Sequence, residues 1–83
     1  MECWTLMNRG YNYRMDMAEE AEHHYSIEMA ENSFWRWVDE PRNMVDDSTE
    51  MFVFLGAPPN DVDFFPDYRI TQGPRGGIRR ERV

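Results

Sequence analysis

The sequence predicts an α+β fold, in which a small antiparallel β-sheet packs against one long amphipathic helix. Three observations support this class: a hairpin pattern near the N-terminus, a run of helical period over residues 16–41, and a continuous apolar run at 49–55. A chain of 83 residues forms one small domain, which buries about 60–65% of the surface of its unfolded chain. With a single cysteine it has no internal disulfide, so its core depends on large apolar and aromatic side chains.

The N-terminal pattern predicts a β-hairpin. Residues 2–7 form a first mostly apolar run, and Asn8-Arg9-Gly10 then supplies the Asn and Gly that a tight turn with positive φ favours. In the next run, 11–17, aromatic and methionine side chains alternate with polar ones at period two. We therefore expect two paired strands with one buried face.

The long helix is expected from Asp16 to Pro41. Asp16 is a suitable N-cap, and Glu19 completes a capping box three residues later. Pro41 disfavours helical geometry at Glu40 and so ends the helix. Between these signals one set of side chains follows the three-and-four spacing of a single stripe. These residues are His24, Ile27, Ala30 or Glu31, Phe34, Trp37 and Val38.

A second interpretation of this stretch stays open. Glu31-Asn32-Ser33 is polar enough to form a turn, and apolar residues also alternate on each side of it. In that case residues 25–30 and 34–38 would be two strands rather than parts of one helix.

The C-terminal half is expected to complete the sheet. Residues 49–55 are apolar on both faces, which predicts a central strand with the helix on one side, and 68–71 predict a short edge strand. Residues 1–72 hold fifteen acids and five Arg, a balance of −10, whereas 73–83 hold four Arg and Glu81, a balance of +3. The sequence thus predicts a compact acidic domain over 1–72 and a basic, flexible C-terminal tail over 73–83.

Candidate chemistry in the sequence is sparse. On a helix Glu20, His24 and Glu28 would share one face and could approach a divalent metal, but a solvated face with Glu–His pairs is the commoner meaning of this spacing. Cys3 has no identifiable base partner and fits a small buried residue in a strand. The sequence therefore predicts no catalytic residue, metal site or cofactor, and we expect a protein that is not an enzyme.

A recognition surface is predicted at the end of the helix and in the loop after it. The run Phe34 to Val38 covers more than one helix face, so Trp35 should be at least partly exposed beside Arg36. Acidic residues follow closely and could grip a basic groove, although such charge also serves solubility. The predicted partner-binding residues are Trp35, Arg36, Asp39, Glu40, Asp46, Asp47 and Glu50.

These features lead to a functional hypothesis. We expect a small acidic protein-binding module: a phage- or virus-encoded inhibitor of a host defence complex, anti-CRISPR-like, that occupies a basic nucleic-acid-binding groove on a host protein or ribonucleoprotein. The hypothesis rests on size and acidity and on no family motif. No apolar stretch is long enough to span a bilayer, so we expect a cytoplasmic location in the host cell, with no membrane partner and no small-molecule substrate.

The alternative is a nucleic-acid-associated regulatory module. It would use exposed aromatic side chains and the Arg/Gly-rich tail. The candidate contacts in this case are Arg75, Arg79, Arg80 and Arg82. The net charge of the body opposes this alternative, because neutralisation of phosphates supplies most of the non-specific affinity for nucleic acid.

Overall fold

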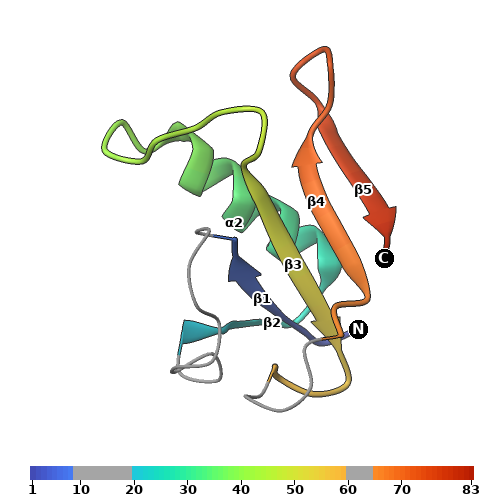
Figure 1. The fold of residues 1–83 in the computed structure, drawn as a ribbon. Coiled ribbons are helices and arrows are strands. Elements are labelled where there is room, and N and C mark those ends of the chain that lie inside the picture. The colour runs from blue at the N-terminus through green and yellow to red at the C-terminus, as the bar shows by residue number, and fades with distance from the viewer. Residues whose placement is uncertain (9–19, 60–64) are drawn as a thin grey trace.

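The computed structural model describes residues 1–8, 20–59 and 65–83. In this part of the chain, five antiparallel strands form one sheet in the order β2-β1-β3-β4-β5, and a 13-residue helix, α2, covers one face (Figure 1). The predicted α+β class is confirmed. The elements are β1 (Cys3–Met7), β2 (Glu22–His24), α2 (Ile27–Asp39), β3 (Glu50–Leu55), β4 (Tyr68–Gln72) and β5 (Ile78–Arg82).

Strand β3 lies at the centre of the sheet, as its apolar sequence predicted. It pairs antiparallel with β1 on one side and with β4 on the other, so that Met51 lies opposite Met7 and Ile70. The first predicted strand is also confirmed, as β1. The second strand of the predicted hairpin, 11–17, and the glycine of its turn lie outside the described residues.

The predicted helix is not continuous through residues 22–24. Residues 22–24 form strand β2, which pairs with β1 and places His24 opposite Cys3. Ser26 is the N-cap of α2: its backbone is extended, and its side-chain oxygen accepts a hydrogen bond from Met29 N at 3.2 Å. The predicted start, with its capping box at Asp16 and Glu19, lies outside the described residues. The predicted helix is interrupted at 22–24 because these residues pair with β1.

The helix ends before Pro41 and is continuous over Ile27–Asp39, as the one-helix interpretation predicts for this part of the chain. Residues 27–39 form one uninterrupted helix, so the two-strand interpretation is wrong. Glu40 has extended backbone geometry, with φ −71° and ψ 116°, before Pro41. Asn43 Nδ2 donates to the carbonyl of Trp37 at 2.9 Å and so satisfies one carbonyl of the last turn.

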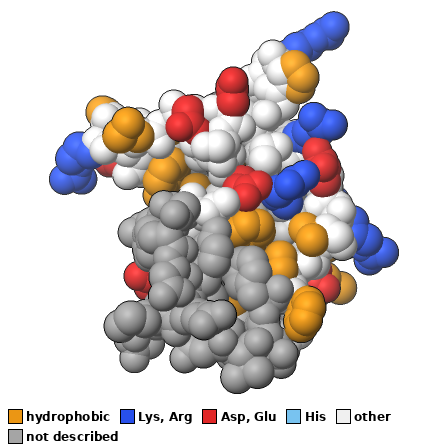
Figure 2. Space-filling view, viewed as in Figure 1, with side chains coloured by type: hydrophobic (Ala, Val, Ile, Leu, Met, Phe, Trp, Pro, Cys, Tyr) orange, Lys and Arg blue, Asp and Glu red, His pale blue; other side chains and the backbone are white. Residues whose placement is uncertain are grey.

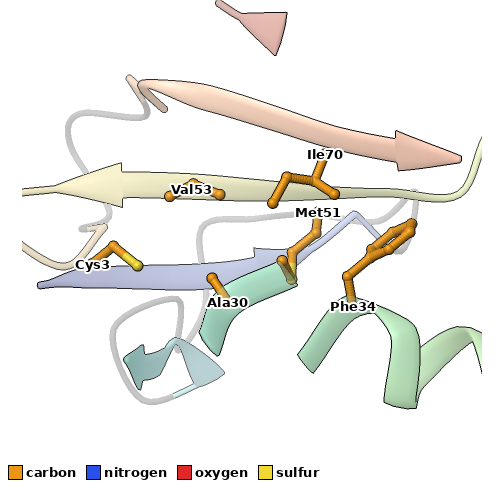
Figure 3. Packing of buried hydrophobic residues seen from close by; sticks show 6 residues of the cluster. All are labelled: Cys3, Ala30, Phe34, Met51, Val53 and Ile70. Atoms are coloured by element: carbon orange, nitrogen blue, oxygen red, sulfur yellow. The ribbon is translucent and has the colours of Figure 1, made fainter. Parts of the chain in front are cut away.

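The main core lies between α2 and the sheet (Figure 3). From the helix, Ala30 and Phe34 point toward the sheet, and from the sheet one side chain in two points back at the helix. All members of the cluster are almost fully buried. They are Cys3, Ala30, Phe34, Met51, Val53 and Ile70.

The C-terminal segment differs from the prediction. Residues 78–82 are not a flexible tail: they form strand β5, which pairs with all of β4. Strand β4, predicted at the edge, is therefore an inner strand. The glycine-rich run makes the turn between them, with Gly76 at φ 81° and a hydrogen bond from Gly73 N to the carbonyl of Gly77. The composition that indicated disorder is the composition of a hairpin turn.

Candidate interaction site

The loop between α2 and β3 holds an acidic residue in a fixed position. Asp46 Oδ1 accepts hydrogen bonds from the backbone N of Ser48 at 2.8 Å and from its hydroxyl at 2.6 Å. In return, Asp46 N donates to Thr49 Oγ1 at 2.9 Å, and Thr49 is buried. The hydrogen bonds from Ser48 lower the pKa of Asp46 because they stabilise the carboxylate. The loop therefore presents a fixed negative charge at neutral pH.

Apolar and acidic side chains lie next to each other in this loop. Met44 is 90% exposed and Val45 is 38% exposed. Asp47 is exposed, and no ion pair joins it to another described residue. An open cleft of about 470 Å³ separates the loop from the β4–β5 hairpin. Residues on its two walls include Val45, Asp46, Asp47, Gln72, Pro74 and Arg79.

The end of α2 adds acidic groups of two kinds. Asp39 is exposed and makes no ion pair within the described residues. Glu40, by contrast, accepts a hydrogen bond from Arg42 Nε at 2.9 Å, so its charge is partly compensated at the surface. Asp39, Asp46 and Asp47 therefore carry most of the uncompensated negative charge of this segment.

Other members of the predicted site lie elsewhere. Trp35 is half-buried, with its ring 6.3 Å from that of Phe34, and Arg36 is exposed. Glu50 lies on the sheet face opposite the helix, where Asn8 Nδ2 donates to it at 2.6 Å and Arg69 Nε lies 3.7 Å away. The structure therefore does not bring Glu50 together with the helix residues.

The arginines of the alternative site are mostly engaged within the chain. Arg79 Nε lies 2.7 Å from Glu81 Oε1, and Arg80 Nη1 lies 3.6 Å from Glu31 Oε1 on α2. Arg80 and Arg82 both extend over the ring of Tyr68, at 5.6 and 5.7 Å from its centroid. Arg75, at the exposed turn, makes no ion pair with the described residues. On the face opposite α2, acidic and basic side chains lie interspersed at the β4–β5 end (Figure 2).

The helical face of Glu20, His24 and Glu28 that was considered for a metal does not form, because His24 belongs to strand β2. It is 4% exposed and its Nε2 lies 2.9 Å from Thr5 Oγ1. Burial, with Arg36 and His23 nearby, lowers the pKa of His24 against the opposing effect of Glu22. Within residues 1–8, 20–59 and 65–83, no group of three or more His, Cys, Asp or Glu side chains is placed to hold a metal ion.

Cys3 is a buried strand residue, as expected. Its thiol lies 3.7 Å from the carbonyl of Ser26, and burial raises its pKa. A raised pKa keeps the sulfur protonated at neutral pH, so the environment opposes thiolate chemistry at this position.

A row of rings was not foreseen. The ring of His23 lies 5.2 Å from that of Trp4 and 4.9 Å from that of Tyr25, which is 70% exposed. His23 Nε2 also lies 3.1 Å from Glu2 Oε1. No sequence signal predicts this row, because it depends on β2 pairing with β1 and placing His23 opposite Trp4.

No family model matches the sequence, and searches of curated proteins and of solved structures found no similar protein. In the part of the chain that the structure describes, no helix has the length and apolar character to cross a bilayer. A functional assignment therefore depends on the surface of the chain itself.

Proposed function

We propose that this protein is a small, non-enzymatic protein-binding module whose acidic surface occupies a basic nucleic-acid-binding groove on a partner protein. In its narrower form, the proposal is a phage- or virus-encoded, anti-CRISPR-like inhibitor of a host defence complex. The observation that carries it is the α2–β3 loop, where Asp46 is held ionised beside Asp47, Met44 and Val45.

The arrangement of this loop suits recognition of a basic surface. A fixed carboxylate loses little freedom on binding, so more of its electrostatic attraction contributes to affinity. Exposed Met44 can pack against varied apolar surfaces. Uncompensated carboxylates also steer association with a positively charged partner and raise its on-rate.

The nucleic-acid alternative has weaker support. Three of its four arginines already contact Glu81, Glu31 or Tyr68, and only Arg75 projects from the turn without an ion pair to a described residue. An Arg that is already paired contributes less to binding a phosphate, since it must first give up its partner. With a net charge of −7, the chain as a whole would also repel a polyanion.

The test compares two charge reversals of equal size. Asp47→Arg changes the loop, and Glu28→Arg changes an exposed acid in the first turn of α2. Each full-length variant is immobilised and used to capture proteins from host extract, with identification by mass spectrometry and titration of the captured protein over a range of salt. We expect Asp47→Arg to weaken binding about tenfold or more and to flatten its salt dependence.

Glu28→Arg should bind nearly as the wild type does. Equal losses in both variants would assign binding to net charge rather than to the loop, and no loss in Asp47→Arg would refute the acidic-loop mechanism. Asp46→Asn is a further variant, because an Asn oxygen can still accept from Ser48 while the charge is removed.

Competition by nucleic acid for the captured partner tests whether the occupied groove is one that binds nucleic acid.

A further inference from the structure

Among the described strands, the sheet ends at β2 on one side and at β5 on the other, and β5 is the longer of these two edge strands. Strand β5 ends the strand order and no described strand pairs with its outer side (Figure 1). The opposite edge, β2, has three residues, whereas β5 has five. A free edge presents backbone N–H and C=O groups that can pair with another chain.

The hydrogen-bond pattern shows which residues of β5 point their backbone N–H and C=O groups away from β4. Val83 N donates to Asp67 O at 3.1 Å, and Gly73 N donates to Gly77 O, at the two ends of the β4–β5 ladder. Because hydrogen-bonded pairs alternate with non-bonded pairs in an antiparallel ladder, Arg79 and Glu81 lie in the bonded pairs. The backbone groups of Ile78, Arg80 and Arg82 therefore point away from β4.

The side chains of β5 divide into two sets. Arg79 and Glu81 lie on the face opposite α2, since Glu81 is opposite Arg69 in the register. Ile78, Arg80 and Arg82 lie on the helix face, where Ile78 packs at the margin of the core and Arg80 reaches Glu31. On the sheet face opposite α2, β5 thus carries one basic and one acidic side chain, two residues apart.

We propose that β5 pairs antiparallel with β5 of a second copy of this chain, in a register centred on Arg80. In this register Arg80 lies opposite Arg80 of the other copy, and Ile78 lies opposite Arg82 of the other copy. The residues with outward backbone groups therefore pair with one another. Arg79, which lies 2.7 Å from Glu81 of its own chain, then also lies opposite Glu81 of the other copy, so that opposite charges face each other at two symmetric positions. The result is a continuous sheet across a twofold axis.

The charge pattern selects this register over its neighbours. A shift by two residues in one direction sets Arg79 against Arg79, and a shift in the other sets Glu81 against Glu81; like charges directly opposite are unfavourable. The central pair of Arg80 residues is the cost of the favoured register. Each Arg80 brings its own counter-charge in Glu31, 3.6 Å away, and also lies over Tyr68.

This inference does not depend on the proposed function, because the pairing uses the backbone of β5 and no residue of the acidic loop. The first measurement is the molar mass of the full chain at up to ~0.5 mM, at an ionic strength near ~0.15 M, where the Debye length is about 8 Å. Screening at that distance reduces repulsion between two copies of charge −7 while leaving direct contacts. We expect a concentration-dependent dimer.

Arg80→Pro tests the backbone pairing. It removes an outward N–H and leaves the inward ladder to β4 intact, so the variant should fold, by circular dichroism, yet remain monomeric. A wild-type chain that stays monomeric at every concentration overturns the proposal. A dimer that persists in folded Arg80→Pro also overturns it, since another surface would then hold the copies together.

A charge exchange tests the register. Arg79→Glu alone sets Glu against Glu81 of the other copy, and Glu81→Arg alone sets Arg against Arg79, so each variant should dimerise at least about tenfold more weakly than the wild type. Mixed together, the two variants restore opposite charges at both positions and should form a heterodimer. Failure of the mixture to dimerise, with both variants folded, refutes this register.

Discussion

The two faces of the sheet are stabilised by different interactions. The helix-covered face buries a continuous apolar cluster around Phe34, together with one polar pair, Thr5 and His24. The opposite face has two parts. Leu6 of β1 and Phe54 of β3 are buried in a small apolar cluster, whereas Arg69 of β4 forms ion pairs with Glu50 and Glu81, the ionic network of this face.

This difference places most of the stability on one face. Burying apolar surface is worth about 25 cal/mol per Å², whereas a surface ion pair contributes about 0–1 kcal/mol. We therefore expect changes under the helix to be costly and changes in the ionic network to be small and dependent on salt. The following predictions test that contrast.

Phe34→Ala should have the largest effect. Phe34 is fully buried, and truncating such a residue costs about 3–5 kcal/mol through lost burial and the cavity that remains. The matched change on the other face is Phe52→Ala, where the ring is half-buried and the loss should be about half as large. Urea unfolding of both variants measures the ratio, and equal losses would show that the two faces contribute equally.

The sequence was sufficient for the elements whose local and tertiary signals agree. The 49–55 run carries apolar side chains on both of its faces. Such a strand is favoured where both faces of the sheet are covered, so its central place in the sheet could be predicted. Pro41 ended the helix because its effect on Glu40 is local and steric.

It was insufficient where pairing decides the outcome. Glu22 to His24 fit a helical stripe and a strand equally well, and only the ladder with β1 selects the strand. Glu50 shares a sequence neighbourhood with Asp46, yet strand alternation puts it on the face away from the helix. The turn at 73–77 was interpreted as disorder because composition alone does not reveal a partner strand.

Thr5→Val should have the second largest effect. The substitution keeps the shape of the side chain but removes the hydroxyl that bonds His24 Nε2, and so leaves a buried ring nitrogen without its partner. Such an unsatisfied group costs about 1–3 kcal/mol. Chemical denaturation of Thr5→Val measures the loss. Thr71→Val, at a half-buried position on the other face, is the control, and a comparable loss there would mean that the His24 bond is unimportant.

The titration of His24 should make stability depend on pH. Because its pKa is lowered by burial from the ordinary value of 6.5, the unfolded chain binds more protons between the folded pKa and 6.5. The stabilising contribution is thus complete above that range and is lost as the pH falls through it. Unfolding free energies measured from pH 8 down to about 5.5 should decrease, before most carboxylates titrate.

His24→Gln removes this titration while keeping a group that can bond Thr5. The difference in unfolding free energy between wild type and His24→Gln should therefore vary with pH in the same range. His23→Gln, which retains His24, should keep that slope. A slope that disappears only in His23→Gln would assign the effect to the surface ring row instead.

Arg69→Gln should have the smallest effect and should reveal the character of the ionic face. Arg69 Nη2 lies 3.0 Å from Glu81 and Nε lies 3.7 Å from Glu50, so its removal leaves Glu50 without this cation, while Glu81 keeps Arg79 at 2.7 Å. We expect a loss of about 0.2–1 kcal/mol that shrinks toward zero near 1 M salt, where the Debye length is about 3 Å. A loss that salt does not change would mean that the aliphatic stem of Arg69 packs against Phe52, its neighbour in the register, and that this face is held by burial after all.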